Sequence, residues 1–348
     1  MADIVLTTYP AERSRNVGDA LITHSMIELV RARVPAFEPV VMFRETPLDE
    51  LPRETRHRVF APGFSVANGT YPALFPLFTD LDRMERFWPV GCSFQANLPE
   101  RASFETPYGK DTLAFLKRMA ERFGPFPCRD QLIVDRLERS GVPAFYLGDL
   151  ALFDEKRIGT ALRVPPPVGT LVITLQHHVR YLEQIVDLAK RVRARYPEWR
   201  RLVSMHAVPN PMNRVLAARM AELGYELLEV HGEVAKLDLY ETVDLHVGYR
   251  LHGHLHFLRN RKPSILMVED ARSYGFSRTQ GTAFGCVDAW SQESREPDDT
   301  APERALALLD EQMASGFSGY APLLAFIDRT HAERVSPWFD AVAEVLNG

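Results

Sequence analysis

Arg250 and His252 stand two positions apart, directly after a short segment, residues 244–248, whose alternating apolar residues predict a β-strand. The residues that follow predict a short helix, which Pro263 ends, and residues 264–268 predict a second, fully apolar strand. A strand, a helix and a strand in this order form a βαβ unit, and such sheets bind ligands beyond the carboxyl ends of their strands. A guanidinium, an imidazole and a helix N-terminus at that place suit an anionic ligand.

Other charged and imidazole side chains of this half also follow predicted strands. The strands are expected over residues 264–268, 171–175 and 202–205. The side chains that follow them are Glu269, Asp270, Arg272, Arg278, His177 and His206. All of them could equally be surface residues, since an arginine or a histidine at a strand end does not require a ligand. The sequence therefore identifies them as possible cleft residues.

The N-terminal half offers a second set of candidates. The first predicted strand is followed by a turn that contains Asn16 and Asp19, and Asp19 is expected to cap the next helix. Arg129 stands where another helix opens, and Asp149 lies at a loop of a strand predicted over 144–153. The turn has neither a GxGxxG nor a GxxxxGK[ST] motif, so binding of a dinucleotide or of phosphate by a P-loop is not supported. Asn16 and Asp19 could also serve only as turn and cap residues.

Strand and helix patterns alternate along the chain, which is the signature of an α/β fold. A chain of 348 residues exceeds one ordinary core, so we expect two domains. We expect an N-terminal α/β domain over 1–155 with long loops over 60–109, a Pro-rich linker over 156–169, a C-terminal α/β domain over 170–315, and a helical tail over 316–348. The further predicted helices cover 112–123, 179–196, 212–223, 301–315 and 332–346. The last of them is expected to return to the first domain.

The composition excludes several classes of protein. A net charge of -5 argues against a nucleic-acid binder, which is usually basic. No apolar run approaches the length of a membrane span, and the N-terminus lacks the basic and apolar segments of a signal peptide. The three cysteines are scattered and odd in number, which suggests a reducing cytoplasm and provides neither a disulfide framework nor a zinc cluster.

A metal site is the rival interpretation for three histidines, His252, His254 and His256. On a strand they would share one face, and on a helix His252 and His256 would lie one turn apart. Histidines at either spacing could bind zinc. Which further side chain would be the third ligand depends on whether the segment is a strand or a helix. We therefore expect no metal, and we expect His254 to be a core residue.

The chain resembles the polysaccharide pyruvyl transferases in several motifs that occur in the family's order over roughly residues 16–281. The motifs are Asn16-Val17-Gly18-Asp19 for the N-x-G-D turn, Arg129-Asp130 for a central helix start, Tyr146-Leu147-Gly148-Asp149-Leu150 for the G-D-P strand, and Val247-Gly248-Tyr249-Arg250-Leu251-His252-Gly253 with Arg261-Lys262-Pro263 for the R-x-H-x…G-x-P signature. The chain departs from the family in three respects. Leu150 replaces proline, Arg272 stands near the usual place of a lysine, and His254 and His256 are extra.

The resemblance implies two Rossmann-like domains that face a central cleft, as in the GT-B glycosyltransferases, with the N-terminal domain on the acceptor side and the C-terminal domain on the donor side. It also implies phosphoenolpyruvate as donor, a saccharide or lipid-linked oligosaccharide as acceptor, a pyruvate ketal as product and no cofactor. The alternatives are a GT-B glycosyltransferase that uses a sugar nucleotide and a non-catalytic carbohydrate-binding relative.

On the implied reaction, the candidate residues take distinct roles. Arg250 would clamp an anion, and His252 would act as general acid, because imidazole is suited to move protons near neutral pH. The expected donor-binding residues are Arg129, Arg272, Asn16 and Asp19. An oxocarbenium-like centre needs electrostatic support, for which the sequence offers Asp149, Glu269 and Asp270.

Overall fold

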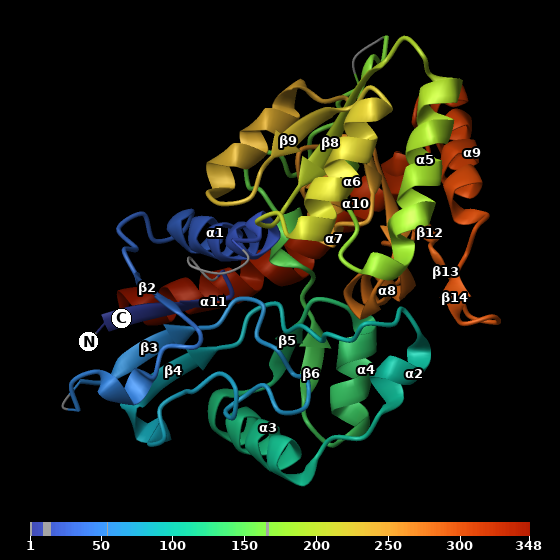
Figure 1. Cartoon of the computed structure of the whole chain (residues 1–348). Coiled ribbons are helices and arrows are strands. Elements are labelled where there is room, and N and C mark those ends of the chain that lie inside the picture. Colours follow the sequence, from blue (N-terminus) through green and yellow to red (C-terminus); the bar gives the residue numbers. More distant parts are fainter. Residues whose placement is uncertain (1, 10–14, 54, 165–166) are drawn as a thin grey trace.

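The computed structural model describes residues 2–9, 15–53, 55–164 and 167–348, and it contains two larger parallel sheets with helices between them (Figure 1). The first sheet has the strand order β2-β1-β3-β4 and the second has the order β12-β11-β10-β7-β8-β9. The strands of the first are β1 (Ala2–Thr7), β2 (Val40–Phe43), β3 (His57–Phe60) and β4 (Met84–Trp88). Those of the second are β7 (Thr170–Thr174), β8 (Arg200–Met205), β9 (Glu226–Glu229), β10 (Leu245–Gly248), β11 (Ser264–Val268) and β12 (Cys286–Asp288).

Two smaller pairs of strands accompany these sheets. β5 (Phe126–Cys128) and β6 (Ala144–Tyr146) form a parallel pair. An isolated backbone β-bridge at Cys92 and Cys128, which are free cysteines, joins this pair to the segment after β4. The antiparallel pair consists of β13 (Trp290–Ser291) and β14 (Glu296–Pro297). The parallel strands of the first half of the chain therefore extend beyond its four-stranded sheet.

The helices connect the strands and cover the sheets. They are α1 (Val17–Arg31), α2 (Arg101–Glu105), α3 (Lys110–Phe123), α4 (Gln131–Arg139), α5 (Leu182–Arg195), α6 (Pro211–Glu222), α7 (Leu251–Arg259), α8 (Ala271–Arg278), α9 (Ala301–Ala314), α10 (Tyr320–Thr330) and α11 (Ser336–Asn347). Strands β10 and β11 are buried throughout, which explains their apolar sequence, because helices cover both faces of a parallel sheet. No helix among the described residues is both long and apolar enough to span a bilayer.

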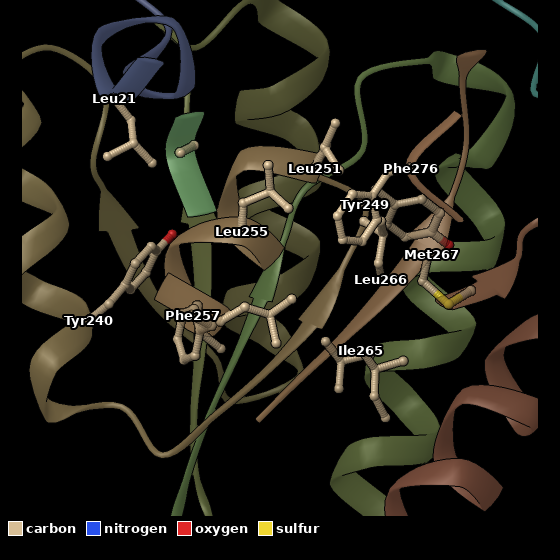
Figure 2. Packing of buried hydrophobic residues seen from close by; sticks show 14 of the residues in the cluster. Leu21, Tyr240, Tyr249, Leu251, Leu255, Phe257, Ile265, Leu266, Met267 and Phe276 are labelled. Carbon is tan, nitrogen blue, oxygen red and sulfur yellow. The ribbon is translucent and has the colours of Figure 1, made fainter. Parts of the chain in front are cut away.

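One apolar cluster extends over both halves of the chain. It joins Leu21 of α1 to Leu255 and Phe257 of α7, and Tyr240 packs beside Phe257 at a ring distance of 5.2 Å (Figure 2). Because α1 begins at the end of β1 and α7 begins at the end of β10, this packing fixes the ends of the two sheets relative to each other. The site described below depends on this contact.

The last helix returns to the N-terminal half, as the sequence predicted. Asp340 of α11 pairs with Arg33 at 2.6 Å, and Arg58 donates to the carbonyl oxygen of Val345 at 3.3 Å. In Figure 1, α11 and α1 accordingly lie near each other on the side of the first sheet. The two larger sheets come from residues before and after the expected linker, and the domain boundaries themselves remain a prediction.

The structure differs from the expected local structure in three places. The strand predicted over 144–153 ends at Tyr146, because Gly148 has φ +99° and the chain then forms a short 3-10 turn at Leu150–Leu152. The loops expected over 60–109 contain β4 and α2. The tail contains the additional helix α10, whose buried residues, including Leu323, Leu324 and Ile327, pack into the core.

Candidate active site

Each of the two larger sheets reverses its strand order at one place. In the second sheet β7 and β10 are neighbours, and the chain continues from β7 toward one edge and from β10 toward the other. In the first sheet the same reversal occurs between β1 and β3. Connections that diverge from neighbouring strands leave a crevice beyond the carboxyl ends of those strands. Residues that follow strands of both sheets line one open cleft of about 490 Å³.

Arg250 is the N-cap residue of α7, and its guanidinium turns back over the end of β7. Its Nε donates to the carbonyl oxygen of Leu175 at 2.9 Å, and its Nη1 lies 3.0 Å from Nδ1 of His177. Burial and the charge of Arg250 lower the pKa of His177 to about 3, so Nδ1 is free to accept this hydrogen bond. Arg250 is buried, and the hydrogen bonds of its guanidinium within the described part of the chain go to the carbonyl oxygens of Leu175 and Gln176 and to His177. A buried guanidinium with carbonyl and imidazole partners suits an anionic ligand.

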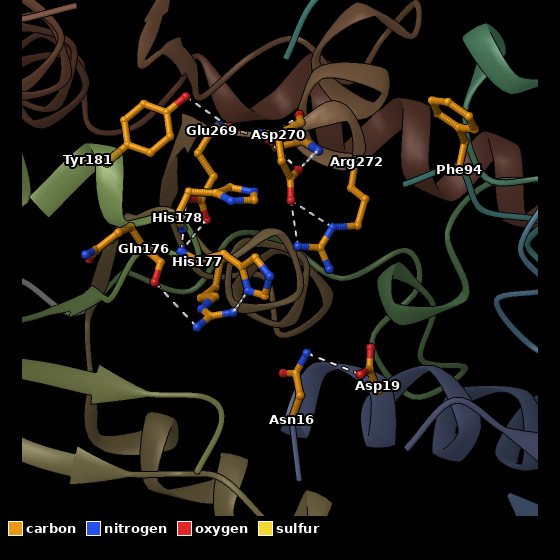
Figure 3. A network of polar contacts seen from close by, with 12 residues as sticks. Asn16, Asp19, Phe94, Gln176, His177, His178, Tyr181, Glu269, Asp270 and Arg272 are labelled. Carbon is orange, nitrogen blue, oxygen red and sulfur yellow. Dashed lines mark hydrogen bonds and ion pairs between the residues drawn. The ribbon is translucent and has the colours of Figure 1, made fainter. Parts of the chain in front are cut away.

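The two acidic residues after β11 have structural partners. Asp270 caps α8 by accepting from the backbone N–H of Ser273 at 3.0 Å, and its other oxygen accepts from Arg272 at 2.6 Å. Glu269 accepts from the backbone N–H of His177 at 2.9 Å, although burial and neighbouring Asp270 raise its pKa to about 8. Glu269 thus holds the loop after β7, and Arg272 points from α8 toward Asn16 and Asp19 (Figure 3).

The N-x-G-D turn lies directly against α7. Asn16, not Asp19 as expected, caps α1, because its side-chain oxygen accepts from the backbone N–H of Gly18 at 3.1 Å and Asp19 already belongs to the first turn. A Cβ atom on Gly18 would lie 2.7 Å from Nδ1 of His252, which is closer than side-chain atoms approach. The glycine of this motif therefore allows the histidine of the other motif to pack on α1. Asn16 and Asp19 both line the cleft.

A buried cluster from the first half surrounds the other face of His252. Its Nε2 lies 3.6 Å from Oδ2 of Asp149, and Nη1 of Arg129 lies 3.8 Å from the same oxygen. Burial alone would raise the pKa of Asp149, but the contact with His252 and the charge of Arg129 hold that pKa below its ordinary value. Asp130, which caps α4, has its pKa raised to about 6 by burial. Nε2 of His252, Oδ2 of Asp149 and Nε of Arg129 are buried without hydrogen-bond partners in the described chain.

Arg129, His252 and Arg272 converge on a narrow recess that is also lined by the ends of β1 and β3. The sequence reasoning missed several further residues of this recess, among them Arg44 and Gln95. Arg44 follows β2, so the same strand-end rule that identified Arg250 could have found it. Gln95 lies in the weakly periodic region after β4, where the sequence shows no comparable signal.

The remaining histidines belong to different parts of the core. His206 borders the site near His252 and Arg250, but its Nε2 is bonded to the hydroxyl of Tyr240 at 2.8 Å, and burial lowers its pKa well below the ordinary value. Nδ1 of His254 is bonded to Ser264 at 2.7 Å, and His256 contacts Asn260 at 3.1 Å. The described residues contain no group of three or more metal-ligating side chains that could hold a metal ion. A metal-free site remains a prediction.

Of the four charged candidates predicted after β11, Arg278 is the one that lines no part of the site. It pairs with Asp288 at 2.7 Å and stacks over Tyr274 at 4.5 Å, so its charge is satisfied outside the described cleft. Within the described residues, the cleft therefore combines Arg250 and Arg272 from the second sheet with Arg44 and Asn16 from the first. Their arrangement, two α/β sheets with the site between their strand ends, defines a protein of the GT-B fold class.

Solved structures share this fold at low sequence identity. The S. aureus MnaA–UDP co-structure is 12% identical with a TM-score of 0.56, over 98% of this chain and 97% of that chain. The putative UDP-N-acetylglucosamine 2-epimerase from Listeria monocytogenes is 12% identical with a TM-score of 0.55, over 98% and 93%. A mutant form of S. aureus TarM, in complex with UDP, is 10% identical with a TM-score of 0.48, and this chain covers only 57% of its length. The first two confirm the predicted fold class.

The family model of the polysaccharide pyruvyl transferases matches residues 16–270, and this chain belongs to that family. The match begins at Asn16, the cap of α1, and ends at Asp270, the cap of α8. It therefore contains Asn16, Asp19, Arg250 and Asp270 of the cleft, whereas the end of β1 and Arg272 lie just outside it. The comparison with curated proteins gave no match.

Proposed function

We propose that this protein transfers the pyruvyl group of phosphoenolpyruvate to two hydroxyl groups of one saccharide and forms a pyruvate ketal. The observation that carries the proposal is the recess at which Arg129, Arg272 and His252 converge, with the guanidinium of Arg250 beside it. Phosphoenolpyruvate has a carboxylate and a phosphate on one carbon, so its binding requires several cations close together. The membership of the pyruvyl transferase family supports the same donor.

The reaction needs one proton at carbon and releases two from oxygen. Protonation of the donor's methylene gives a methyl group and an oxocarbenium-like centre at the adjacent carbon. One acceptor hydroxyl attacks this carbon, the bond between carbon and the phosphate oxygen breaks, and a second hydroxyl closes the ring. Of the two hydroxyl protons, one balances the proton given to the methylene, and the other leaves with phosphate. The site must therefore bind two anionic groups and deliver one proton.

His252 is the proposed proton donor. It lies at the N-terminus of α7 between the N-x-G-D turn and Asp149, and its Nε2, which has no hydrogen-bond partner among the described residues, lies 3.6 Å from the Asp149 carboxylate. A carboxylate beside an imidazole orients the ring. Arg129 and Arg272 would hold the donor's anions within the recess, and Arg250 would hold the departing phosphate at the end of β7. Asn16 and Asp19 would contact the donor from α1.

The test is His252→Gln, which keeps a hydrogen-bond donor of similar volume but cannot deliver a proton. We expect this variant to bind phosphoenolpyruvate in calorimetry but to lose roughly 10²–10⁴-fold in single-turnover rate. His231→Gln is the control, because the ring of His231 pairs with Glu229 at the end of β9 and does not line the cleft. A normal rate in His252→Gln, or loss of donor binding, would remove His252 from this role.

A thermal-shift panel separates the donors. A ligand that binds only the folded state raises the melting temperature, so phosphoenolpyruvate should do so and sugar nucleotides should not. Stabilisation by a sugar nucleotide alone would support the glycosyltransferase alternative. The single-turnover rate should be the same before and after exhaustive chelation, since no step of the proposed reaction requires a metal.

A further inference from the structure

The two walls of the cleft differ in charge. The wall from the second sheet carries Arg250, Arg272, Asp270 and two histidines, whereas the wall contributed by residues 65–97 carries only uncharged side chains. Arg44, at the end of β2, lines the same cleft. Its guanidinium lies over the ring of Phe75 at 3.9 Å and also borders the narrow recess. The uncharged wall thus offers hydrogen bonds without ion pairs.

Only some polar groups on this wall are free to bind a ligand. Asn68 donates to Pro107 at 3.1 Å and accepts from Gly109 at 2.9 Å, so its amide joins two loops. Thr70 donates to the carbonyl oxygen of Ala67 at 2.7 Å. The side chains of Gln95 and Asn97 are exposed in the cleft and form no hydrogen bond within the described part of the chain. These two amides are the unused hydrogen-bonding groups of the wall.

The segment that carries both amides is fixed to the donor side of the site. The carbonyl oxygen of Ala96, the residue between them, accepts from the backbone N–H of Ala271 at 3.1 Å. Ala271 precedes Arg272 on α8, so a single hydrogen bond holds the amides beside that arginine. Gln95 also lines the recess with Arg129 and His252. Gln95 therefore belongs to both the uncharged wall and the recess.

We propose that Gln95 and Asn97 form the acceptor subsite and that this subsite selects an uncharged hexopyranose. The proposal rests on the proposed function, because it takes the recess as the donor's place. A carboxamide has one acceptor oxygen and two N–H donors, so it can bind two neighbouring hydroxyl groups of a sugar. A ketal forms on two such hydroxyl groups. Leu74, 58% exposed on the same wall, provides an apolar surface for the C–H face of a sugar ring.

An acidic sugar would fit this wall poorly. A uronate carboxylate placed against this wall would lose water without gaining an ion pair from it, because the side chains that residues 65–97 contribute to the cleft are all uncharged. Asp19 also lies across the cleft and would repel it. Neutral and acidic hexoses are therefore the informative pair of probes.

The experiment measures binding of methyl galactopyranoside, methyl glucopyranoside and methyl glucuronide to the whole chain, together with binding of phosphoenolpyruvate. Gln95→Ala and Asn97→Ala should each weaken binding of a neutral glycoside roughly three- to tenfold, the loss expected for one or two neutral hydrogen bonds. Phosphoenolpyruvate affinity should change less than about twofold in Asn97→Ala, which does not border the recess. Asn347→Ala, which removes an exposed amide at the end of α11, should change neither.

The outcomes separate the two proposals. Tighter binding of the glucuronide than of the neutral glycosides, or unchanged neutral binding in both variants, overturns the subsite. Binding of phosphoenolpyruvate without binding of any glycoside overturns the subsite and leaves the donor assignment standing. Neutral binding that is lost in the variants, with no binding of phosphoenolpyruvate to the native chain, overturns the proposed function and leaves the subsite standing.

Discussion

Gly18→Ala is the substitution that most directly tests how the two halves build the site. The added Cβ would lie 2.7 Å from Nδ1 and 2.8 Å from Cβ of His252. Gly18 is in the first turn of α1 and does not have a positive φ, so alanine meets no backbone strain there. The substitution therefore acts through one contact, between the N-x-G-D turn and His252.

The expected effect on activity exceeds the effect on stability. Overpacking a buried contact costs about 1–3 kcal/mol, and replacing glycine by alanine in a helix returns up to about 1 kcal/mol. The free energy of unfolding should thus fall by about 0–3 kcal/mol. Normal separations exceed 3.4 Å, so His252 or α1 must move by a large part of 1 Å, and a displacement of that size at a reacting group costs roughly 10²-fold in rate.

The assay compares single-turnover rate, phosphoenolpyruvate affinity and melting temperature in Gly18→Ala and in Gly169→Ala. Gly169 has a conformation open to alanine, and a Cβ there would meet no atom within 4 Å, so the control should match the native protein in all three. A native rate in Gly18→Ala would show that the packing of His252 against α1 does not set its position. A large loss of stability with an unchanged rate per folded molecule would show that the glycine serves only the core.

Three further predictions concern charge. Arg250→Lys keeps the charge but loses the planar fork, so phosphoenolpyruvate should bind roughly 10–100-fold more weakly in calorimetry, and unchanged affinity would exclude Arg250 from donor binding. Glu269 has a pKa of about 8 in the folded protein, so between its unfolded value of 4.5 and about 8 the folded state holds the extra proton, and the free energy of unfolding falls as pH rises. Denaturation at several pH values should show a smaller fall in Glu269→Gln, and identical profiles would contradict the raised pKa. Arg261, at φ +59°, is buried and pairs with Asp328, so Arg261→Ala should cost about 2–4 kcal/mol in the free energy of unfolding, and Arg261→Gly about 1 kcal/mol less because glycine favours that φ. Equal losses in the two variants would refute the argument from backbone strain.

Much of the second sheet could be predicted from the sequence. The apolar segments at β10 and β11 and the glycine and proline residues around them define a βαβ unit by local pattern alone. Arg250 and His252 follow from that unit, because residues after a parallel strand lie at the end where ligands bind. The ordered motifs then indicated the family, which the family model confirms.

The first half was less predictable, because its periodicity is weak. β4 lies within aromatic and proline-rich sequence, and Gln95 follows it in a segment whose position depends on a hydrogen bond to Ala271, far along the chain. The glycine at 148 turned an apolar run that looked like one strand into a short strand and a 3-10 turn. Such breaks depend on backbone conformation that apolar spacing does not report.

The sequence by itself determined which residues end the strands; only the tertiary structure decided which strand ends meet. Asn16 and Gly18 are separated from His252 by more than 230 positions. Asn16 caps α1, and the contact of Gly18 with His252 places this helix start at the site. That contact exists because the strand order reverses in each sheet and because the apolar faces of α1 and α7 pack against each other. Side-chain periodicity encodes which face of an element is buried, whereas the partner of that face depends on the free energy of packing the whole chain.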